Sequence, residues 1–144
     1  MTMRLSTEVL VIGAGPAGTA AAHWAAESGR MVVLLKKETM PRERVCGDAL
    51  TPKAVGHLAD MGIEVNNNNF HQHHGLRMTA HGQSIELQWP TDHDHPSHGL
   101  AIRRRSLDKL LVEHADNTGA QVWTGVEVIE PIIEHGHLRG CRAM

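Results

Sequence analysis

Two short apolar runs near the start of the chain flank a stretch rich in small residues. Val9 to Ile12 is an uninterrupted apolar run of strand length, and Met31 to Leu35 is a second one. Between them, Thr19 to Ala26 is rich in alanine and is closed by Gly29. Short apolar runs bounded by glycine favour buried strands, whereas a longer alanine-rich stretch favours a helix. The pattern predicts a strand, a helix and a second strand, which is the βαβ unit of an α/β fold.

The middle of the chain alternates between helical and strand patterns. Thr51-Pro52 has the residue types of a helix N-terminus, and the predicted helix runs to Met61 with Gly62 as its stop. Apolar and polar residues then alternate on both sides of His81-Gly82, which predicts a hairpin with one apolar face. This hairpin is an insertion at about 75–99 in a single domain spanning 1–144. We expect Met78 and Trp89 to face the core.

The last third repeats the strand and helix pattern. Helical spacing of leucines after the Leu100–Ile102 run predicts a helix that ends at Gly119. Residues 119–129 supply a further strand, and the turn at His135-Gly136 begins a β-meander. The expected fold is therefore a Rossmann-like, glutathione reductase-like βαβ domain followed by the start of a β-rich substrate domain.

The segment between the first strand and the first helix reads GxGxxG. Gly13 permits a sharp turn, Gly15 permits close approach of a pyrophosphate, and Gly18 lets the helix lie against the strand. Pro16 stands where the first turn of a helix tolerates proline. With a strand before it and a helix after it, the pattern predicts a dinucleotide site at the helix N-terminus.

The end of the second strand departs from this pattern. Dinucleotide folds place an acidic residue there for the ribose hydroxyls, but Lys36 occupies the position, followed by Lys37 and Glu38. Lysine cannot accept a hydrogen bond from a hydroxyl group. Either Glu38 takes over, or the site prefers an extra phosphate, or binding is weakened. We favour weakened or rearranged binding.

The amino-acid composition argues against several classes of function. The 144 residues carry a formal charge of −2, with one Phe, three Trp and no Tyr, which argues against nucleic-acid binding. No apolar run reaches membrane-spanning length, so we expect a cytoplasmic protein. In that compartment Cys46 and Cys141 are expected to be free thiols. The clustered histidines, among them His71, His73 and His74, are expected to lie in solvated loops, with no metal.

A proline- and glycine-rich loop precedes the helix at Thr51. Its polar residues Arg44, Cys46 and Asp48 lie just ahead of that helix N-terminus, where a thiol is shifted towards thiolate. The alternative for Cys46 is a small buried side chain.

Gly13-Ala14-Gly15-Pro16-Ala17-Gly18, followed by Pro41-x-x-Arg44-x-Cys46-Gly47-Asp48, resembles the geranylgeranyl reductase family of FAD-dependent oxidoreductases. That family belongs to the p-hydroxybenzoate hydroxylase-like flavoproteins. The segment from Arg104 to Leu111, Arg-x-x-Leu-Asp-x-x-Leu, is similar to its third recurring motif. The neighbouring arginines, Arg103 and Arg105, are expected to be solvated charges.

The resemblance implies an FAD site. The glycine loop would hold the pyrophosphate, Arg44 and Arg104 would lie along the cofactor, Cys46 would lie close to the flavin, and the backbone at Val128 would meet the adenine. The candidate cofactor-binding residues are Gly13, Gly15, Pro16, Ala17, Gly18, Lys36, Lys37, Arg44, Cys46, Gly47, Asp48, Arg104 and Val128.

The resemblance also implies an activity, which is reduction of prenyl C=C bonds. Hydride would come from reduced flavin, with NAD(P)H or another reductant as electron donor. A prenyl lipid is the expected substrate, with contact at the membrane periphery in the full-length protein, and the proton donor stays unassigned.

Two alternatives remain open. One is an FAD-dependent monooxygenase or halogenase of the same superfamily, against which Cys46-Gly47-Asp48 counts. The other is an inactive dinucleotide-binding remnant. We expect the chain to be the N-terminal portion of a longer flavoenzyme, because Leu138 to Arg142 has the pattern of a strand without its partner.

Overall fold

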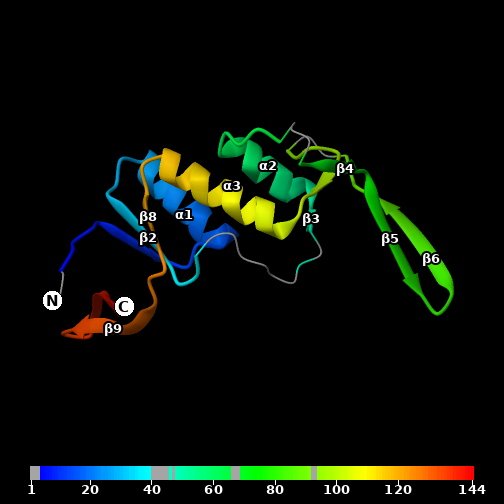
Figure 1. Cartoon of the computed structure of the whole chain (residues 1–144). Helices are drawn as coiled ribbons and strands as arrows, with labels where there is room; N and C mark the ends of the chain where they lie inside the picture. The colour runs from blue at the N-terminus through cyan, green and yellow to red at the C-terminus, as the bar shows by residue number, and fades with distance from the viewer. Residues whose placement is uncertain (1–3, 40–45, 47, 66–68, 92–93) are drawn as a thin grey trace. The chain divides into compact units, whose positions relative to one another are not determined.

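The computed structural model describes residues 4–39, 46, 48–65, 69–91 and 94–144. The chain divides into two compact units. The first comprises Met1–Glu43 and Leu107–Met144, and the second comprises Arg44–Ser106, the mainly green part of the ribbon in Figure 1.

The first unit is built on a parallel sheet with the strand order β1-β2-β8. Strand β1 (Val9–Ile12) leads through helix α1 (Pro16–Glu27) to β2 (Val32–Lys36), and β8 (Gln121–Thr124) pairs with the other edge of β2. This order is the 3-2-1 half of a Rossmann sheet. The predicted βαβ unit is confirmed.

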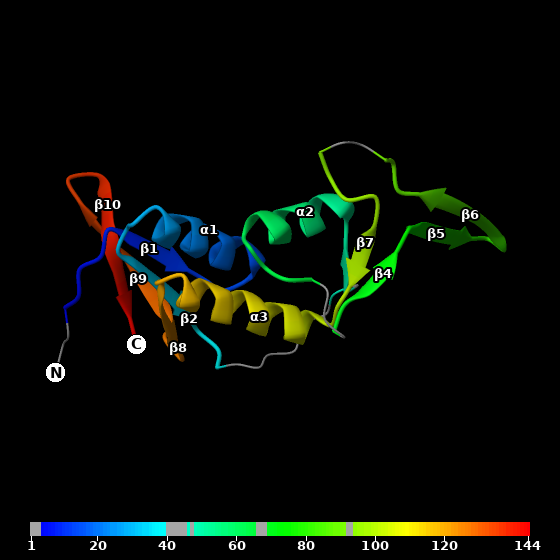
Figure 2. The ribbon, with the colours of Figure 1, turned by 90° about the horizontal axis from the view of Figure 1, so that it is seen from above.

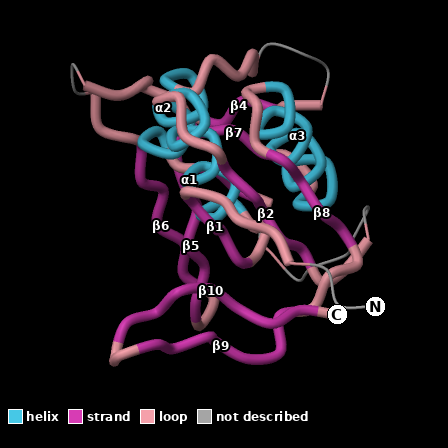
Figure 3. Tube along the Cα trace, turned by 90° about the vertical axis from the view of Figure 1, so that its left-hand side faces the viewer, coloured by secondary structure: helices cyan, strands magenta, loops and turns pink. Residues whose placement is uncertain are grey.

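Helices α1 and α3 (Arg104–Asn117) pack on this sheet (Figure 3). Only the part of α3 from Leu107 onward belongs to the first unit. Small residues on both helices let them approach the strands closely. The buried cluster contains Ala14, Ala22, Val32, Leu34, Ala115 and Ala120. Leu34, Ala22 and Ala115 have no exposed surface. The alanine-rich pattern noted in α1 is therefore the pattern of a helix packed tightly on a sheet.

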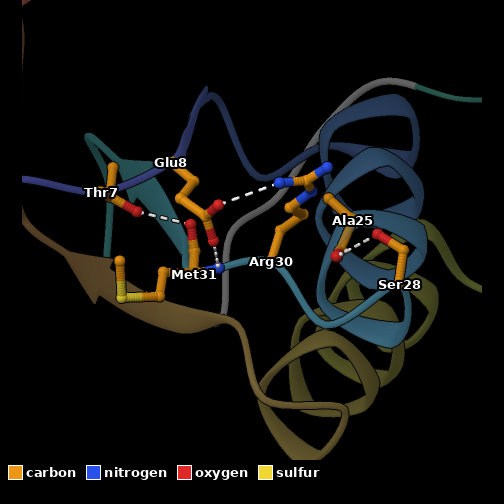
Figure 4. Close-up of polar contacts among 6 residues, drawn as sticks. All are labelled: Thr7, Glu8, Ala25, Ser28, Arg30 and Met31. Carbon is orange, nitrogen blue, oxygen red and sulfur yellow. Dashed lines mark hydrogen bonds and ion pairs between the residues drawn. The ribbon is translucent and has the colours of Figure 1, made fainter.

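Polar contacts fix the start of β1 to the start of β2 (Figure 4). The Glu8 carboxylate accepts from the Met31 backbone N–H at 2.8 Å and from Arg30 Nη1 at 3.0 Å. The Thr7 hydroxyl donates to the Met31 carbonyl at 2.6 Å. The two hydrogen bonds to the carboxylate lower the pKa of Glu8, the one from the Met31 N–H more than the one from Arg30. They hold the two strands in register where the sheet begins.

The first unit ends in a two-stranded antiparallel hairpin. Strand β9 (Val128–Glu134) pairs with β10 (His137–Ala143) across a turn in which His135 and Gly136 have φ of 51° and 77° (Figure 2). Such positive angles at both central residues suit a tight hairpin turn. The predicted turn at His135-Gly136 is confirmed. The expectation that Leu138 to Arg142 lacks its partner strand is wrong, because this segment pairs with β9 across the turn.

The second unit has a small antiparallel sheet with the order β3-β7-β4. Its strands are β3 (Ala49–Leu50), β7 (Gly99–Ala101) and β4 (His71–His73), and helix α2 (Pro52–Asp60) packs against β3 and β7. The Thr51 side chain accepts from the Ala54 N–H, and Gly62 follows α2 with φ of +75°. The helix boundaries predicted from Thr51-Pro52 and Gly62 are confirmed to within one residue.

The histidines at 71 and 73 are not in a loop, so that expectation is wrong. They belong to β4, whose backbone pairs with β7 from Gly99 to Ala101. The sequence His-Gln-His has no apolar alternation, so its strand conformation comes from backbone pairing with a distant segment. His71 is exposed, and His73 is half-buried.

The predicted hairpin is present as β5 (Gly75–Ala80) and β6 (Gln83–Gln88). Its register places Leu76 opposite Leu87 and Met78 opposite Ile85, so these four side chains share one face. All four are exposed, Met78 to 62%. The expectation that Met78 faces the core is therefore wrong. Trp89 is half-buried and donates from Nε1 to Nδ1 of His73 at 3.2 Å.

Candidate functional site

The GxGxxG segment forms a tight link from β1 into α1. Gly13 has φ of +101°, and its N–H donates to the Leu35 carbonyl at 2.8 Å, which ties the loop to the end of β2. A methyl group at Gly18 would overlap the Gly13 carbonyl oxygen and would lie 3.1 Å from its carbon. It would also lie 3.4 Å from Cγ1 of Val11. Only glycine at position 18 lets the helix approach the strand this closely.

Gly15 lies in a different environment. It is the N-cap of α1 with φ of −84°, and a Cβ built on it meets no atom within 4 Å. Pro16 occupies the first turn, which carries no acidic side chain. The space at Gly15 therefore adjoins a helix N-terminus that favours anions and has no competing carboxylate in its first turn. The loop fits the pyrophosphate of a dinucleotide.

The end of β2 carries two lysines with different surroundings. Lys36 is 4% exposed, and its carbonyl accepts from the Val126 N–H at 2.9 Å. Lys37 is exposed and forms an ion pair with Glu127 at 2.5 Å, which raises the pKa of Lys37. Val128, the residue expected near the adenine, opens β9 just beyond this pair and is half-buried. The two lysine charges at this edge of the sheet are therefore not equivalent.

In the second unit, Asp48 joins two segments that the sequence pattern singled out separately. Its carboxylate Oδ1 accepts from the Arg104 N–H at 2.9 Å, at the first residue of α3. Its carbonyl accepts from the Ile102 N–H at 2.8 Å. Asp48 holds this position with φ of +55°, a conformation that Asp tolerates better than most residues. One aspartate therefore caps α3 and fixes the segment that follows Cys46.

Cys46 lies next to this junction and is exposed. A hydrogen bond from the Asp48 backbone and one from the Arg104 side chain lower the pKa of the Cys46 thiol. Desolvation and the Asp48 charge oppose the shift. The expected thiolate character is therefore supported, but it arises from contacts with Asp48 and Arg104 rather than from the N-terminus of α2. The alternative of a small buried side chain is wrong.

A cavity of about 430 Å³ opens beside this junction in the second unit. Its lining combines the apolar end of β7 with polar side chains from β4, from the first turn of α3 and from the segments next to these elements. The lining residues are Asp48, Asn69, His71, Ala101, Ile102, Arg103 and Ser106. Asn69, His71, Arg103 and Ser106 were not among the predicted site residues, because they become neighbours only through strand pairing.

Two predicted site residues, Arg44 and Gly47, lie outside the described residues. Pro16 and Ala17 are exposed at the start of α1. Both cysteines are free, as expected. Over the described part of the chain, no three His, Cys, Asp or Glu side chains gather in a way that could hold a metal ion. No described helix combines the length and apolarity that crossing a bilayer requires.

Comparison with known proteins identifies the family to which this chain belongs. A family model described as FAD binding domain matches residues 6–136. Menaquinone reductase from Mycobacterium tuberculosis is 41% identical over 129 residues, which is 90% of this chain and 31% of that protein. The chain therefore spans about a third of the length of this relative.

Two solved structures share the fold. A myxobacterial chondrochloren halogenase, an FAD-dependent halogenase, superposes with a TM-score of 0.83 at 28% identity, over 95% of this chain and 32% of that one. A geranylgeranyl bacteriochlorophyll reductase-like protein from Thermoplasma acidophilum superposes with a TM-score of 0.79 at 27% identity, over 95% of this chain and 34% of that one.

Proposed function

Since the chain belongs to the FAD binding domain family, we propose that it is the FAD-binding part of a reductase that saturates C=C bonds of prenyl chains. The observation that carries the proposal is the 41% identity with a menaquinone reductase over 90% of the chain. Menaquinone is a quinone with a prenyl tail, so the proposed substrate class is a polyprenyl quinone or a related prenyl lipid. The geranylgeranyl reductase type is supported by the motif from Arg44 to Asp48 and by the superposition on a reductase-like structure.

The residues of the glycine loop bind the cofactor in this proposal. The open space at Gly15 and the N-terminus of α1 take the pyrophosphate, and Gly18 keeps the helix close enough to do so. In this proposal Lys36 and Lys37 lie near the ribose of the cofactor, and the backbone at Val128 contacts the adenine. When bound, FAD supplies the hydride that the reduction of a C=C bond requires.

The cluster of Cys46, Asp48 and Arg104 has a positioning role at the flavin end. Asp48 orders the start of α3, which fixes the backbone that carries Arg104. Cys46 is an exposed thiol whose pKa is lowered by its neighbours, so it suits a polar contact with cofactor or substrate. NAD(P)H or another reductant is the proposed electron donor. Because a prenyl tail is apolar and resides in lipid, the full-length protein is proposed to contact the membrane surface.

A second candidate is an FAD-dependent halogenase or monooxygenase. The superposition on a halogenase with a TM-score of 0.83 favours it, because this fold supports both chemistries. A third candidate is a dinucleotide-binding remnant without turnover, which the lysine at position 36 favours. The first experiment tests whether the chain holds FAD, which both enzyme candidates require. The second experiment separates the candidates by product, because the remnant forms none.

The first experiment is the visible absorbance spectrum of the purified chain after incubation with FAD and removal of the excess. We expect a retained flavin band that disappears in Gly15→Val, because the added side chain fills the space for the pyrophosphate. Gly140→Val is the matched control, since a Cβ at this β10 glycine also meets nothing within 4 Å. A wild-type chain that retains no flavin contradicts the proposal and favours the remnant.

The second experiment uses the FAD-loaded chain with a chemical reductant and a polyprenyl quinone. The proposal expects a product that has gained one hydride and one proton across a prenyl C=C bond, detected by mass spectrometry. The parallel assay for halogenation adds oxygen and chloride to the FAD-loaded chain with the same chemical reductant and the same quinone. A chlorinated or hydroxylated product without prenyl reduction would assign the chain to the halogenase and monooxygenase group.

A further inference from the structure

A buried histidine in the first unit has no part in the proposed flavin chemistry. His23 lies in the middle of α1 and is 3% exposed. Its Nδ1 lies 2.9 Å from the Thr118 hydroxyl oxygen, and that hydroxyl donates to the His114 carbonyl at 2.8 Å. The Thr118 oxygen must therefore accept from His23, which assigns the proton of the neutral ring to Nδ1.

This tautomer leaves Nε2 of His23 as a buried lone pair. No hydrogen-bond partner reaches it among the described residues. Protonation of the ring would place a new N–H and a positive charge at this atom. A buried N–H that has lost its hydrogen bonds to water and gained none in the protein destabilises the closed packing.

The surroundings of His23 carry one negative and one basic group. Glu27, one turn along α1, places Oε2 at 3.6 Å from Nε2, beyond hydrogen-bond distance. The ring of His114, in the last turn of α3, stacks at a centroid distance of 4.8 Å and a tilt of 35°, and Trp24 contacts the ring edge-on at 4.8 Å. Burial and the neighbouring His114 lower the pKa of His23, and Glu27 partly offsets this.

We propose that the packing of α1 against the last turn of α3 is an acid-sensitive contact, opened by uptake of one proton at Nε2 of His23. The opened state exposes the imidazolium to water, which solvates the new N–H and its charge more fully than Glu27 does at 3.6 Å in the closed packing. Because α1 also carries Gly15 at its N-terminus, opening loosens the helix that forms the dinucleotide loop. The inference concerns the chain without cofactor and does not depend on the flavin proposal.

The direction of the pH dependence follows from proton linkage. The pKa of His23 is lower in the closed state than in the open state, where it has the ordinary value of about 6.5. The open state therefore binds more protons, and acid favours it. The opening constant should rise by up to about tenfold per pH unit below about pH 6.5, and it should be nearly constant above about pH 7.5.

Hydrogen exchange of the cofactor-free chain tests this between about pH 5 and about pH 8, with rates corrected for intrinsic exchange. We expect amides of α1 and of the last turn of α3 to lose protection in acid, relative to those of α2 in the second unit. His23→Asn should flatten the profile, because its amide can donate to Thr118 but cannot take up a proton. His135→Asn is the matched control and should leave the wild-type profile unchanged, since His135 is an exposed histidine outside all three helices and Asn tolerates its φ of 51°.

A second variant keeps the test decisive if His23→Asn does not fold. Glu27→Gln removes the carboxylate that favours the charged ring in the closed state, so acid should open the contact further than in the wild type. A flat wild-type profile would overturn the proposal, and so would an unchanged pH dependence in the folded His23→Asn variant or in Glu27→Gln.

Discussion

Separate replacement of Gly18 and Gly15 by alanine tests whether Gly18 is needed for helix packing and Gly15 for cofactor binding. At Gly18 the new methyl group would overlap the Gly13 carbonyl oxygen, with 3.1 Å to the carbonyl carbon and 3.4 Å to Cγ1 of Val11. The obstacle is backbone, so α1 must move away from β1. At Gly15 the same methyl group meets no protein atom within 4 Å.

The magnitudes differ accordingly. Overpacking of this kind costs about 1–3 kcal/mol, and the rigid backbone obstacle favours the upper end of that range. Alanine regains at most about 1 kcal/mol of helix propensity. We therefore expect Gly18→Ala to lower the free energy of unfolding by about 2 kcal/mol. Gly15→Ala exchanges one N-cap residue for a poorer one and should lower it by less than about 1 kcal/mol.

The assay is urea denaturation of both variants, followed by the FAD retention measurement. Gly15→Ala should keep nearly the wild-type unfolding midpoint and still lose the flavin band, because its methyl group points into the space reserved for the pyrophosphate. Gly18→Ala should lose both stability and flavin. Equal stability of the two variants would refute the close approach of α1 to β1, and full flavin retention by Gly15→Ala would refute the location of the pyrophosphate.

Three further predictions concern single side chains. Because Asp48 and Arg104 lower the pKa of the Cys46 thiol, Cys46 should be alkylated by iodoacetamide at lower pH than an ordinary thiol. Arg104→Gln should move the pH profile of alkylation upward, whereas an unmoved profile would show that the arginine has no influence. Thr51→Ala removes the side-chain acceptor at the start of α2 and should lower the free energy of unfolding by about 1 kcal/mol, with Thr51→Ser close to wild type in urea denaturation. The folded pKa of Glu8 is lowered, so its contribution is present above about pH 4.3 and is lost as the pH falls through the folded pKa. Glu8→Gln should accordingly show a smaller loss of stability on acidification than the wild type, and an identical pH dependence would exclude this role.

Local sequence rules predicted the elements whose boundaries are set by neighbouring residues. The glycine loop, the apolar run of β2 and the Thr51-Pro52 start of α2 each contain their own signal within a few residues. The parallel pairing of β1 with β2 also follows, because a strand, helix and strand in close succession form a right-handed βαβ unit. The pairing of β8 with the other edge of β2 was not predicted, because the whole second unit lies between these strands in the sequence.

Contacts between distant residues were the part that sequence reasoning missed. The bond from Arg104 to Asp48 spans 56 residues, and the contact of His23 with Thr118 spans 95. Aspartate is a common helix cap, but the usual signal places the cap directly before its helix. Neither contact leaves a periodic trace in the sequence, so only the fold reveals that Asp48 orders α3 and that His23 has a threonine partner.

The hairpin of β5 and β6 sets how this chain behaves in concentrated solution. Leu76, Met78, Ile85 and Leu87 form a continuous apolar strip on one face, and the opposite face carries the ion pair of Arg77 with Glu86. Exposed apolar strips on strands invite self-association, and a lone two-stranded hairpin is marginally stable in water. We therefore expect self-association of the chain to increase with its concentration. Met78→Lys together with Ile85→Glu would place an opposite-charge pair across the strands and raise solubility without touching the glycine loop.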